Sequence, residues 1–287
     1  MSAGNDIASK VVLVTGCSQG GIGFALCEEF AAAGCKVYAT ARRESAMDGF
    51  SHERIEKVVL DVTDEENRKS VINKVLREFG RIDVLVNNAG GNQTHLRVGP
   101  ILDVDLDAAR KAFETNCFAP MRLAQLAIPY MAEQGGGMVV NVGSVAGNMP
   151  SPWNGAYSAT KGAFHLMSDA LALECSYLNK NIHVMLIAPG AVESNIASNA
   201  SGYNLPPDSM FTNFTQIIQK RIAASQGKHS MKAEDFSRRV VSKVLGANPP
   251  DYMTLGGLSV WFAVVQWFPR FLFRWVVGKV LNKPNQP

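Results

Sequence analysis

The chain has 287 residues, of which 47% are hydrophobic and 18% are charged, a composition that suits a globular protein of one or two domains. The formal net charge is only +3 and no run of five basic residues occurs, which argues against a nucleic-acid partner. The five cysteines show no metal-ligand spacing, so we expect no metal site and reduced thiols in an intracellular protein. At the start of the chain, residues 1–9 are polar and residues 11–14 are too short an apolar run for the core of a signal peptide, so no secretory signal is expected.

A strand, a glycine loop and a helix follow one another near the start of the chain. The β-branched run 10–14 predicts a strand, residues 15–23 read TGCSQGGIG, and residues 24–33 predict a helix that Gly34 ends. Backbone N–H groups at the start of such a helix bind pyrophosphate together with the helix dipole, and glycine lets the phosphate come close. We therefore predict a dinucleotide site, with a tight turn that binds nothing as the alternative. The expected cofactor contacts are Gly16, Ser18, Gln19, Gly21, Ile22 and Gly23.

The second predicted strand, residues 36–41, bears on the choice of cofactor. A site for NAD carries an acidic residue after this strand, where it binds the ribose 2′-hydroxyl. This chain has Arg42 and Arg43 there, and a cation suits a 2′-phosphate. The pattern favours NADP(H), with an ordinary solvated arginine pair as the alternative.

Two further strands end in polar or small residues. Residues 56–60 predict the third strand and residues 83–86 the fourth, with a helix over 65–79 between them. Asp61 can accept a hydrogen bond from an adenine amine, or it can cap the following helix. The fourth strand runs into Asn-Asn-Ala-Gly at residues 87–90, where ligands of doubly wound sheets bind, although asparagine there also forms turns. The expected cofactor contacts are Asp61, Val62, Asn88, Ala89 and Gly90.

Asn116 and Ser144 come before the most informative helix. Asn116 falls inside a predicted helix over 107–133, where asparagine is unfavourable, so we expect a local distortion or a specific hydrogen bond at that point. Residues 138–142 predict the fifth strand, which leads into Ser144.

Tyr157 and Lys161 lie four residues apart and therefore share one face of the next predicted helix. An ammonium group near a phenol stabilises the phenolate and lowers its pKa. A tyrosine tuned in this way can give a proton to a carbonyl oxygen or take one from an alcohol. Alone, the pair would suit a solvated helix face; with the glycine loop, Asn116 and Ser144 in the same chain, a catalytic site is the better interpretation.

The remaining strands complete the predicted sheet. Residues 182–188 predict the sixth strand, closed by Pro189 and Gly190, and residues 251–255 predict the seventh. Alternating strands and helices imply an α/β, doubly wound Rossmann fold with a seven-stranded parallel sheet, formed by residues 1–257.

A polar segment interrupts the pattern between the last two strands. Residues 196–232 are polar, contain a predicted helix over 214–224, and read as an insertion that covers the substrate. Residues 233–245 predict a further helix before the last strand.

Residues 258–287 form an aromatic C-terminal extension. Gln266, Arg270 and Arg274 recur every four residues among bulky apolar side chains, which predicts an amphipathic helix with a narrow polar stripe. The charge-free run 252–269 is 18 residues long, which is borderline for a membrane span of roughly 20 residues. Peripheral contact with a membrane surface is the interpretation we favour; packing against the catalytic domain or a dimer partner is the alternative.

Together these motifs resemble the short-chain dehydrogenase/reductase family over nearly the whole chain. The family's Asn, Ser, Tyr and Lys pattern matches Asn116, Ser144, Tyr157 and Lys161, and its Asn-Asn-Ala-Gly motif stands intact at 87–90. The resemblance implies NADP(H)-dependent reduction of a ketone to an alcohol, with Tyr157 as proton donor and Ser144 polarising the carbonyl oxygen. It also implies that Lys161 lowers the pKa of Tyr157 and holds the nicotinamide ribose, and that Asn116 orders a water chain.

The family's Pro-Gly motif also has a counterpart. It matches Pro189 and Gly190, and the hydroxyl that meets the nicotinamide amide is Ser194, where threonine is commoner; Val192 lies between them as a further expected contact. The glycine loop departs from the family's T-G-x-x-x-G-x-G by one extra residue, so either Gly20 or Gly21 faces the phosphate.

The longer glycine loop, the Ala-Thr-Ala-Arg-Arg run and the aromatic tail are similar to one fungal branch of the family. That branch includes NADPH-dependent 1-acyldihydroxyacetone phosphate reductases and reductases of secondary metabolism. The resemblance does not identify the substrate, but the family commonly forms dimers or tetramers, so we expect a homodimer or homotetramer. From the aromatic tail we expect a hydrophobic or lipid-like carbonyl substrate delivered from a membrane surface. With the tail, the resemblance implies a cytoplasmic protein on the cytosolic face of the endoplasmic reticulum or of lipid droplets. The alternatives are a biosynthetic reductase acting on a ketone or a C=N bond, and a cofactor-bound binding or scaffold protein without redox activity.

Overall fold

The computed structural model describes residues 7, 10–90, 98–150, 152–178, 180–193, 205–223 and 230–281. One sheet of parallel strands runs through them in the order β3-β2-β1-β4-β5-β6-β7. The strands are β1 Val11–Thr15, β2 Lys36–Ala41, β3 Ile55–Val59, β4 Val84–Asn87, β5 Gly137–Val142, β6 Ile182–Pro189 and β7 Tyr252–Leu255. The doubly wound α/β fold with seven parallel strands, predicted from the sequence, is confirmed.

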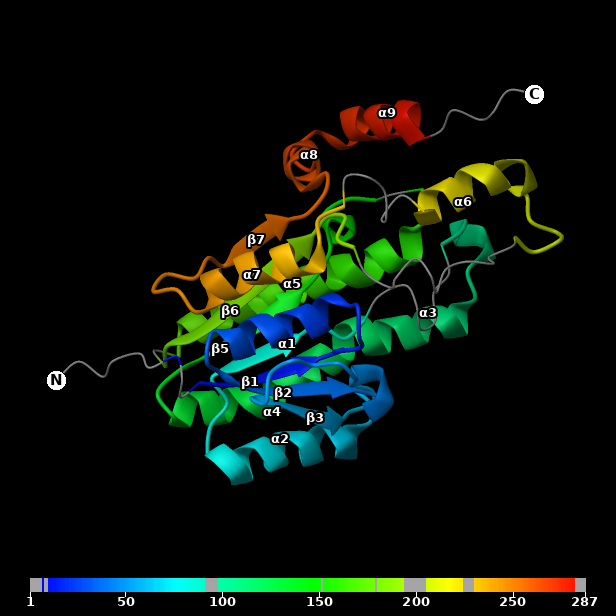
Figure 1. Ribbon diagram of the computed structural model, residues 1–287. Coiled ribbons are helices and arrows are strands. Elements are labelled where there is room, and N and C mark those ends of the chain that lie inside the picture. The colour runs from blue at the N-terminus through cyan, green and yellow to red at the C-terminus, as the bar shows by residue number, and fades with distance from the viewer. Residues whose placement is uncertain are drawn as a thin grey trace.

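Helices cover both faces of this sheet (Figure 1). They are α1 Ile22–Ala32, α2 Glu65–Phe79, α3 Leu106–Phe113, α4 Ala119–Glu133, α5 Gly155–Ser176, α6 Thr215–Ala223, α7 Ala233–Val244, α8 Ser259–Val265 and α9 Arg270–Leu281. The core between the sheet and α1 and α7 contains Val12 and Val14 of β1, and the core towards α2, α4 and α5 contains Val11 and Leu13. Successive residues of a strand point to opposite faces, so a strand buried on both faces reads as a continuous apolar run.

The start and end of α2 follow directly from its sequence. Asp64 caps the first turn by accepting a hydrogen bond from the backbone N–H of Asn67 at 2.9 Å. Gly80 ends the helix in the left-handed conformation, with φ of 66°, which glycine adopts without strain. Asp64 is therefore the cap of this helix, and the alternative role considered for Asp61 is wrong.

The single helix expected over residues 107–133 is instead three consecutive segments. A π-helical turn, Glu114–Phe118, separates α3 from α4 and contains Asn116. This wider turn is the local distortion that an asparagine at this position predicted.

The C-terminal extension also departs from the expected single helix. It consists of α8 and α9, which are joined by residues 266–269. Pro269 lacks an N–H and restricts the residue before it, which disfavours a continuous helix through this point. Gln266 and Arg270 consequently lie on either side of the break, and the predicted stripe does not run along one helix.

The predicted insertion 196–232 is described in part. Residues 205–223 include α6, whereas residues 196–204 and 224–229 lie outside the described residues. Across the described ranges, no helix is both long enough and apolar enough to cross a membrane.

Candidate active site

The glycine loop, the end of β4 and the start of α1 meet around Gly16 and Gly23. Gly16 has φ of +74°, and a Cβ atom there would lie 2.7 Å from the Cα atom of Ala89. A Cβ atom at Gly23 would lie 2.5 Å from Asn88 Nδ2 and 2.5 Å from the carbonyl oxygen of Gly16. Because only glycine fits, loop and helix pack backbone against backbone, as a pyrophosphate site of this type requires.

The first turn of α1 suits an anionic group. Gly21 occupies the position before the helix, where it has no side chain to cap the N–H groups, and Ile22 is the first helical residue. Gly20 closes the preceding turn with φ of +72°, and Ser18 and Gln19 are exposed beside it. Uncapped N–H groups at a helix N-terminus are the donors that bind phosphate, so the residues present fit a dinucleotide.

Asn88 holds the glycine loop in place. Its Nδ2 atom donates to the backbone oxygens of Thr15, at 2.8 Å, and Gly16, at 3.0 Å. In return, Thr15 Oγ1 accepts from the backbone N–H groups of Asn88 and Ala89, both at 3.0 Å. The side chain of Asn88 therefore shapes the loop, while Gly90 lies exposed next to it.

Arg42 and Arg43 follow β2 and are both exposed, where a ribose phosphate could reach them. Burial raises the pKa of the neighbouring Asp61, but hydrogen bonds from Thr63 and the charges of Arg42 and Arg68 outweigh burial and hold that pKa below its ordinary value. The Thr63 hydroxyl donates to Asp61 at 2.7 Å. Asp61 is therefore a carboxylate at neutral pH, as an acceptor for an adenine amine must be.

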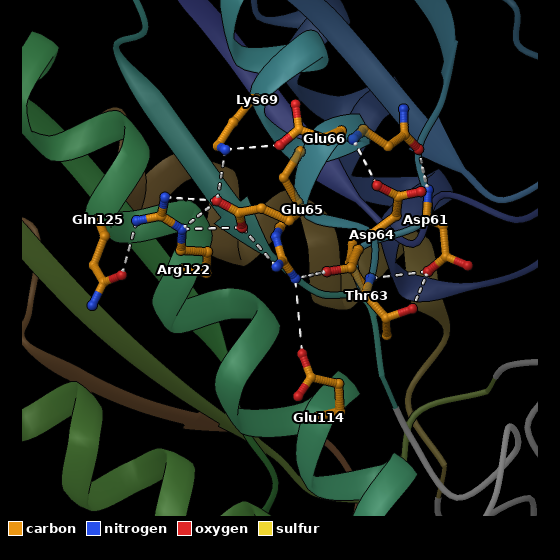
Figure 2. Close-up of polar contacts among 12 residues, drawn as sticks. Asp61, Thr63, Asp64, Glu65, Glu66, Lys69, Glu114, Arg122 and Gln125 are labelled. Atoms are coloured by element: carbon orange, nitrogen blue, oxygen red, sulfur yellow. Dashed lines mark hydrogen bonds and ion pairs between the residues drawn. The ribbon is translucent and has the colours of Figure 1, made fainter.

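An ion-pair network joins the segment after β3 to α4 and to the π-helical turn (Figure 2). Buried Arg68 donates to the backbone oxygen of Val62 at 2.5 Å and to Glu65 at 2.8 Å, and it lies 3.9 Å from Glu114. Arg122 of α4 also binds Glu65, at 2.7 Å, and is the main reason why the pKa of Glu65 falls to about 2. The backbone at Val62, an expected adenine contact, is thus fixed by a charged side chain.

The π-helical turn directs Asn116 towards α5. Asn116 is almost fully buried, and its Nδ2 atom donates to Thr160 Oγ1 at 3.0 Å. A Cβ atom at Gly90 would lie 2.5 Å from Asn116 Oδ1, so the close approach of these two residues requires glycine. Asn116 therefore connects the end of β4 to the helix that carries Tyr157 and Lys161.

Ser144 and Tyr157 are neighbours in the structure, close enough for the Ser144 hydroxyl to act on the pKa of Tyr157. Ser144 follows β5, and its Oγ atom also accepts from the backbone N–H of Ala146 at 3.2 Å. Burial raises the pKa of Tyr157 above its ordinary value, and the hydrogen bond with Ser144 offsets part of that shift. The two expected catalytic residues are therefore adjacent, and Tyr157 is protonated at neutral pH.

Lys161 is buried one turn after Tyr157, where its Nζ atom donates to the backbone oxygen of Val142 at 3.0 Å. Burial lowers the pKa of Lys161 to about 8. Burial of the phenol is the larger effect on the pKa of Tyr157, and the Lys161 ammonium group donates to Val142, so a lowering of that pKa by Lys161 stays a prediction for the cofactor-bound enzyme.

The expected contacts after β6 are described up to residue 193. Pro189 ends the strand, and a Cβ atom at Gly190 would lie 2.3 Å from the backbone oxygen of Gly257. Val192 is buried, and Ser194 lies outside the described residues. Within the part of the chain that the structure describes, no three His, Cys, Asp or Glu side chains are placed to hold a metal ion.

An apolar pocket of about 240 Å³ opens beside the start of α5. Trp153 packs there with its ring 5.4 Å from that of Phe211 and 5.5 Å from that of Phe214, which come from the insertion. The residues that line the pocket are Pro100, Ile101, Leu102, Pro152, Trp153, Gly155 and Phe211. Gly155 is the first residue of α5, the helix that carries Tyr157, but none of Asn116, Ser144, Tyr157 and Lys161 lines the pocket.

Sequence reasoning missed His165 and Asn148. His165 lies four residues after Lys161 on α5, and its Nε2 atom accepts a hydrogen bond from the backbone N–H of Ser144 at 3.2 Å. Its Nδ1 atom lies 2.8 Å from Asn148 Oδ1. The i, i+4 spacing from Lys161 is the signal that could have placed His165 at the site.

Comparison with known proteins agrees with this geometry. A family model described as short chain dehydrogenase matches residues 10–203. A short-chain dehydrogenase of Penicillium crustosum is 35% identical over 267 residues, which are 92% of this chain and 94% of the relative. The NADPH-dependent 1-acyldihydroxyacetone phosphate reductase of Schizosaccharomyces pombe is 33% identical over 217 residues, which are 74% of this chain and 71% of that protein.

Solved structures show the same fold. A short-chain dehydrogenase from Streptomyces avermitilis aligns with a TM-score of 0.78 at 33% identity and covers 94% of this chain and 96% of its own. A short-chain dehydrogenase from Burkholderia cenocepacia in complex with NADP aligns with a TM-score of 0.73 at 22% identity, covering 94% of this chain and 98% of its own.

Proposed function

The chain belongs to the short-chain dehydrogenase family of oxidoreductases, and from that membership we propose that it reduces a ketone to an alcohol with NADPH. The arrangement that supports this proposal best is the proximity of Ser144 to Tyr157, with Lys161 buried one turn away on α5. These residues supply a hydroxyl, a proton donor and a cation, the groups that a carbonyl oxygen needs as it gains charge.

The protonation state of Tyr157 suits the role of proton donor in reduction. A proton donor must hold its proton before the reaction, and the raised pKa of Tyr157 keeps the phenol protonated at neutral pH. When Tyr157 gives that proton to the substrate oxygen, the resulting phenolate is stabilised by the Ser144 hydroxyl and by the charge of Lys161. At pH 7 Lys161, with a pKa of about 8, is still mostly protonated.

NADPH, when bound, supplies the hydride. The glycine loop and the start of α1 would hold its pyrophosphate, and Asp61 and Val62 would face its adenine. Arg42 and Arg43 are exposed where a 2′-phosphate would need cations, which supports NADPH over NADH. The NADPH-dependent relative from Schizosaccharomyces pombe supports the same choice.

The apolar pocket beside Gly155 supports a hydrophobic substrate. Its lining is aliphatic and aromatic. Trp153, which lines the pocket, packs against the rings of Phe211 and Phe214 of the insertion. We therefore propose a ketone with an apolar chain or ring, as in lipid or secondary metabolism.

A panel of aliphatic and aromatic ketones of increasing length, followed by NADPH absorbance, tests this function. Turnover that rises with apolar chain length is expected. NADPH consumption with imines but not with ketones would indicate C=N reduction, which product structure would identify. Tight NADPH binding without consumption across the panel would indicate a binding or scaffold protein.

We further propose that the C-terminal extension makes peripheral contact with a membrane. Val265 and Phe273 are buried against Met149, with Phe262 and Phe268 beside them, so one face of α8 and α9 packs on the loop after Ser144. Other apolar side chains of the extension are exposed: Trp267, between the two helices, is 83% exposed, and Phe271 of α9 is 76% exposed. In Figure 1 both helices lie at the periphery, beyond β7.

The charge of the extension supports an anionic membrane as its partner. No Asp or Glu occurs after Asp251 in the sequence, whereas Arg270, Arg274 and Lys279 are exposed on α9. Aromatic rings suit the interface of a bilayer, and cations near an anionic surface are attracted by about 1 kcal/mol each. The proposed location is the cytosolic surface of the endoplasmic reticulum or of lipid droplets, with the protein as a homo-oligomer.

A further inference from the structure

His165 binds the backbone of Ser144 from inside the protein. It lies on α5, is 6% exposed, and its Nε2 atom accepts the Ser144 N–H at 3.2 Å. Its Nδ1 atom lies 2.8 Å from Asn148 Oδ1, and Asn148 Nδ2 donates to the hydroxyl oxygen of Tyr252 at 2.7 Å. Both ring nitrogens therefore have partners, and the chain of contacts runs from the catalytic loop to β7.

These partners determine the protonation state of the ring. A backbone N–H can only donate, so the Nε2 atom that receives it carries no proton. The proton then lies on Nδ1, where Asn148 Oδ1 accepts it. An imidazolium would place an N–H against the N–H of Ser144, so the neutral Nδ1–H form is the only one that satisfies every contact.

The loop is shaped to admit the ring. A Cβ atom at Gly143 would lie 2.1 Å from His165 Nε2, and one at Gly147 would lie 2.7 Å from His165 Cε1. Two glycines on either side of Ser144 therefore leave the space that the imidazole fills. Side chains of any size at these positions would push the loop off the ring.

We propose that His165 is a positioning residue for Ser144, whose backbone it holds so that the hydroxyl meets the substrate oxygen. The inference rests on the proposed role of Ser144 in carbonyl reduction. With its N–H held by His165 and its Oγ atom held by the N–H of Ala146, Ser144 has little freedom to turn away from Tyr157.

The environment of the ring agrees with a permanently neutral histidine. Burial, and next the charge of Lys161, lower the pKa of His165 to about 4. The ring therefore stays an acceptor for Ser144 throughout the physiological range of pH.

Two magnetic resonance measurements test the contact without any substrate. In the full-length protein labelled with nitrogen-15, His165, assigned by its loss in His165→Gln, should show a protonated Nδ1 and an unprotonated Nε2 from pH 5.5 to 8. Hydrogen exchange at the Ser144 amide should be at least about 10-fold faster in His165→Ala, because that amide loses its acceptor. A protonated Nε2, or unchanged exchange in the folded variant, would overturn the proposal.

Steady-state kinetics test whether the position of Ser144 affects turnover. With the best ketone of the panel, His165→Ala should lower kcat by about 10-fold to 100-fold, the loss expected when a catalytic group is misplaced. The Kd for NADPH should stay within about twofold of the wild-type value, because His165 contacts the backbone of Ser144 and not the glycine loop. His165→Gln, which keeps an acceptor at the position of Nε2, should recover part of kcat and serves as the test if His165→Ala does not fold.

Ser168→Ala is the matched control. Ser168 is buried on the same helix, and its hydroxyl accepts from Asn141 Nδ2 at 2.9 Å and donates to the backbone of Phe164. Loss of this buried hydroxyl should lower stability but leave kcat unchanged. An equal loss of kcat in the two alanine variants would mean that His165 has only a structural role, whereas a wild-type protein inactive on every ketone would count against the proposed function.

Discussion

Asn116 Nδ2 donates to Thr160 Oγ1 at 3.0 Å, across 44 residues of sequence, and joins the π-helical turn to the helix that carries Tyr157 and Lys161. Thr160 is fully buried, and its hydroxyl in turn donates to the backbone oxygen of Tyr157 at 2.8 Å. The Thr160 hydroxyl therefore links Asn116 to the backbone of Tyr157, the proposed proton donor, and we call this pair of hydrogen bonds the relay.

Thr160→Val removes this relay without changing the shape of the side chain. The buried amide of Asn116 loses the hydrogen bond to Thr160, so we expect the free energy of unfolding to fall by about 1–3 kcal/mol and kcat to fall with it. Thr40→Val is the control, because the buried Thr40 hydroxyl donates to the backbone of Val14 at 3.0 Å, away from the catalytic residues. Denaturant unfolding and ketone reduction are measured for both; a normal kcat in Thr160→Val would show that the relay serves stability alone.

Tyr157→Phe removes the proposed proton donor and keeps the ring. Turnover should fall by at least about 100-fold, the contribution of general acid catalysis. NADPH binding, measured by fluorescence, should survive, since the phenol hydroxyl meets Ser144 and not the glycine loop. Turnover close to that of the wild type would mean that another group gives the proton.

Arg42→Ala tests the preference for NADPH. Loss of a charged hydrogen bond to the 2′-phosphate should weaken NADPH by about 1.5–3 kcal/mol and leave NADH nearly unchanged. Arg43→Ala is the matched variant, since Arg43 is also exposed after β2. The Kd values of both cofactors distinguish three cases. Weaker binding of NADPH alone in Arg42→Ala assigns the 2′-phosphate to Arg42, and the same result in Arg43→Ala assigns it to Arg43. If neither variant weakens NADPH selectively, the proposal is contradicted.

The pH dependence of reduction should follow Lys161. The pKa of Lys161 is lowered to about 8, so its ammonium group loses its proton as the pH rises through 8 and can no longer stabilise the phenolate of Tyr157. We therefore expect kcat to be flat below pH 7 and to fall above pH 8. Lys161→Arg keeps its charge at these pH values, so whatever activity it retains should not show the alkaline fall. A wild-type profile that is flat to pH 10 would contradict this role.

Vesicle flotation tests the C-terminal extension. Full-length protein should float with vesicles of phosphatidylcholine and phosphatidylserine at low salt, and less with phosphatidylcholine alone. Arg270→Ala with Arg274→Ala should weaken binding to anionic vesicles by about 2 kcal/mol, or about 30-fold. Trp267→Ala should weaken binding to both kinds of vesicle, whereas Tyr177→Ala, which removes an exposed aromatic residue far from the extension in sequence, should have no effect.

Substitutions are a sharper test here than truncation. Removal of residues 258–287 would also uncover Met149, against which Val265 and Phe273 pack. A full-length protein that stays unbound at low salt, together with changed oligomeric state in Trp267→Ala, would assign the exposed face to a second subunit.

Much of the fold could be predicted because local signals are strong. β2 and α2 have the bounds expected from the sequence, residues 36–41 and 65–79. The π-helical turn could be expected only as a distortion, because its form depends on the contact between Asn116 and Thr160. The break in the extension was missed although Pro269 is a local signal, because the stripe of polar residues was given more weight than the proline.

In the candidate site, too, local sequence signals identify some residues, whereas the roles of others depend on packing. The residues of the glycine loop and of the catalytic pattern could be proposed because each lies next to a recognisable element. The role of His165 could not, because it depends on two glycines that make room for the ring and on Asn148 reaching β7. The pKa of Tyr157 was missed for a related reason: burial and the partner of Lys161 are properties of the packed structure.

The order of the strands has a consequence for synthesis on the ribosome. β1, made first, lies between β2 and β4, so all the strands that carry the glycine loop and Asn88 exist once residue 90 has emerged. Their core still lacks Phe236 and Val240 of α7, and Asn148 must wait for Tyr252. Domains generally fold as units during translation, so the glycine loop and the loop that carries Ser144 should become fixed together, after residue 252 has emerged.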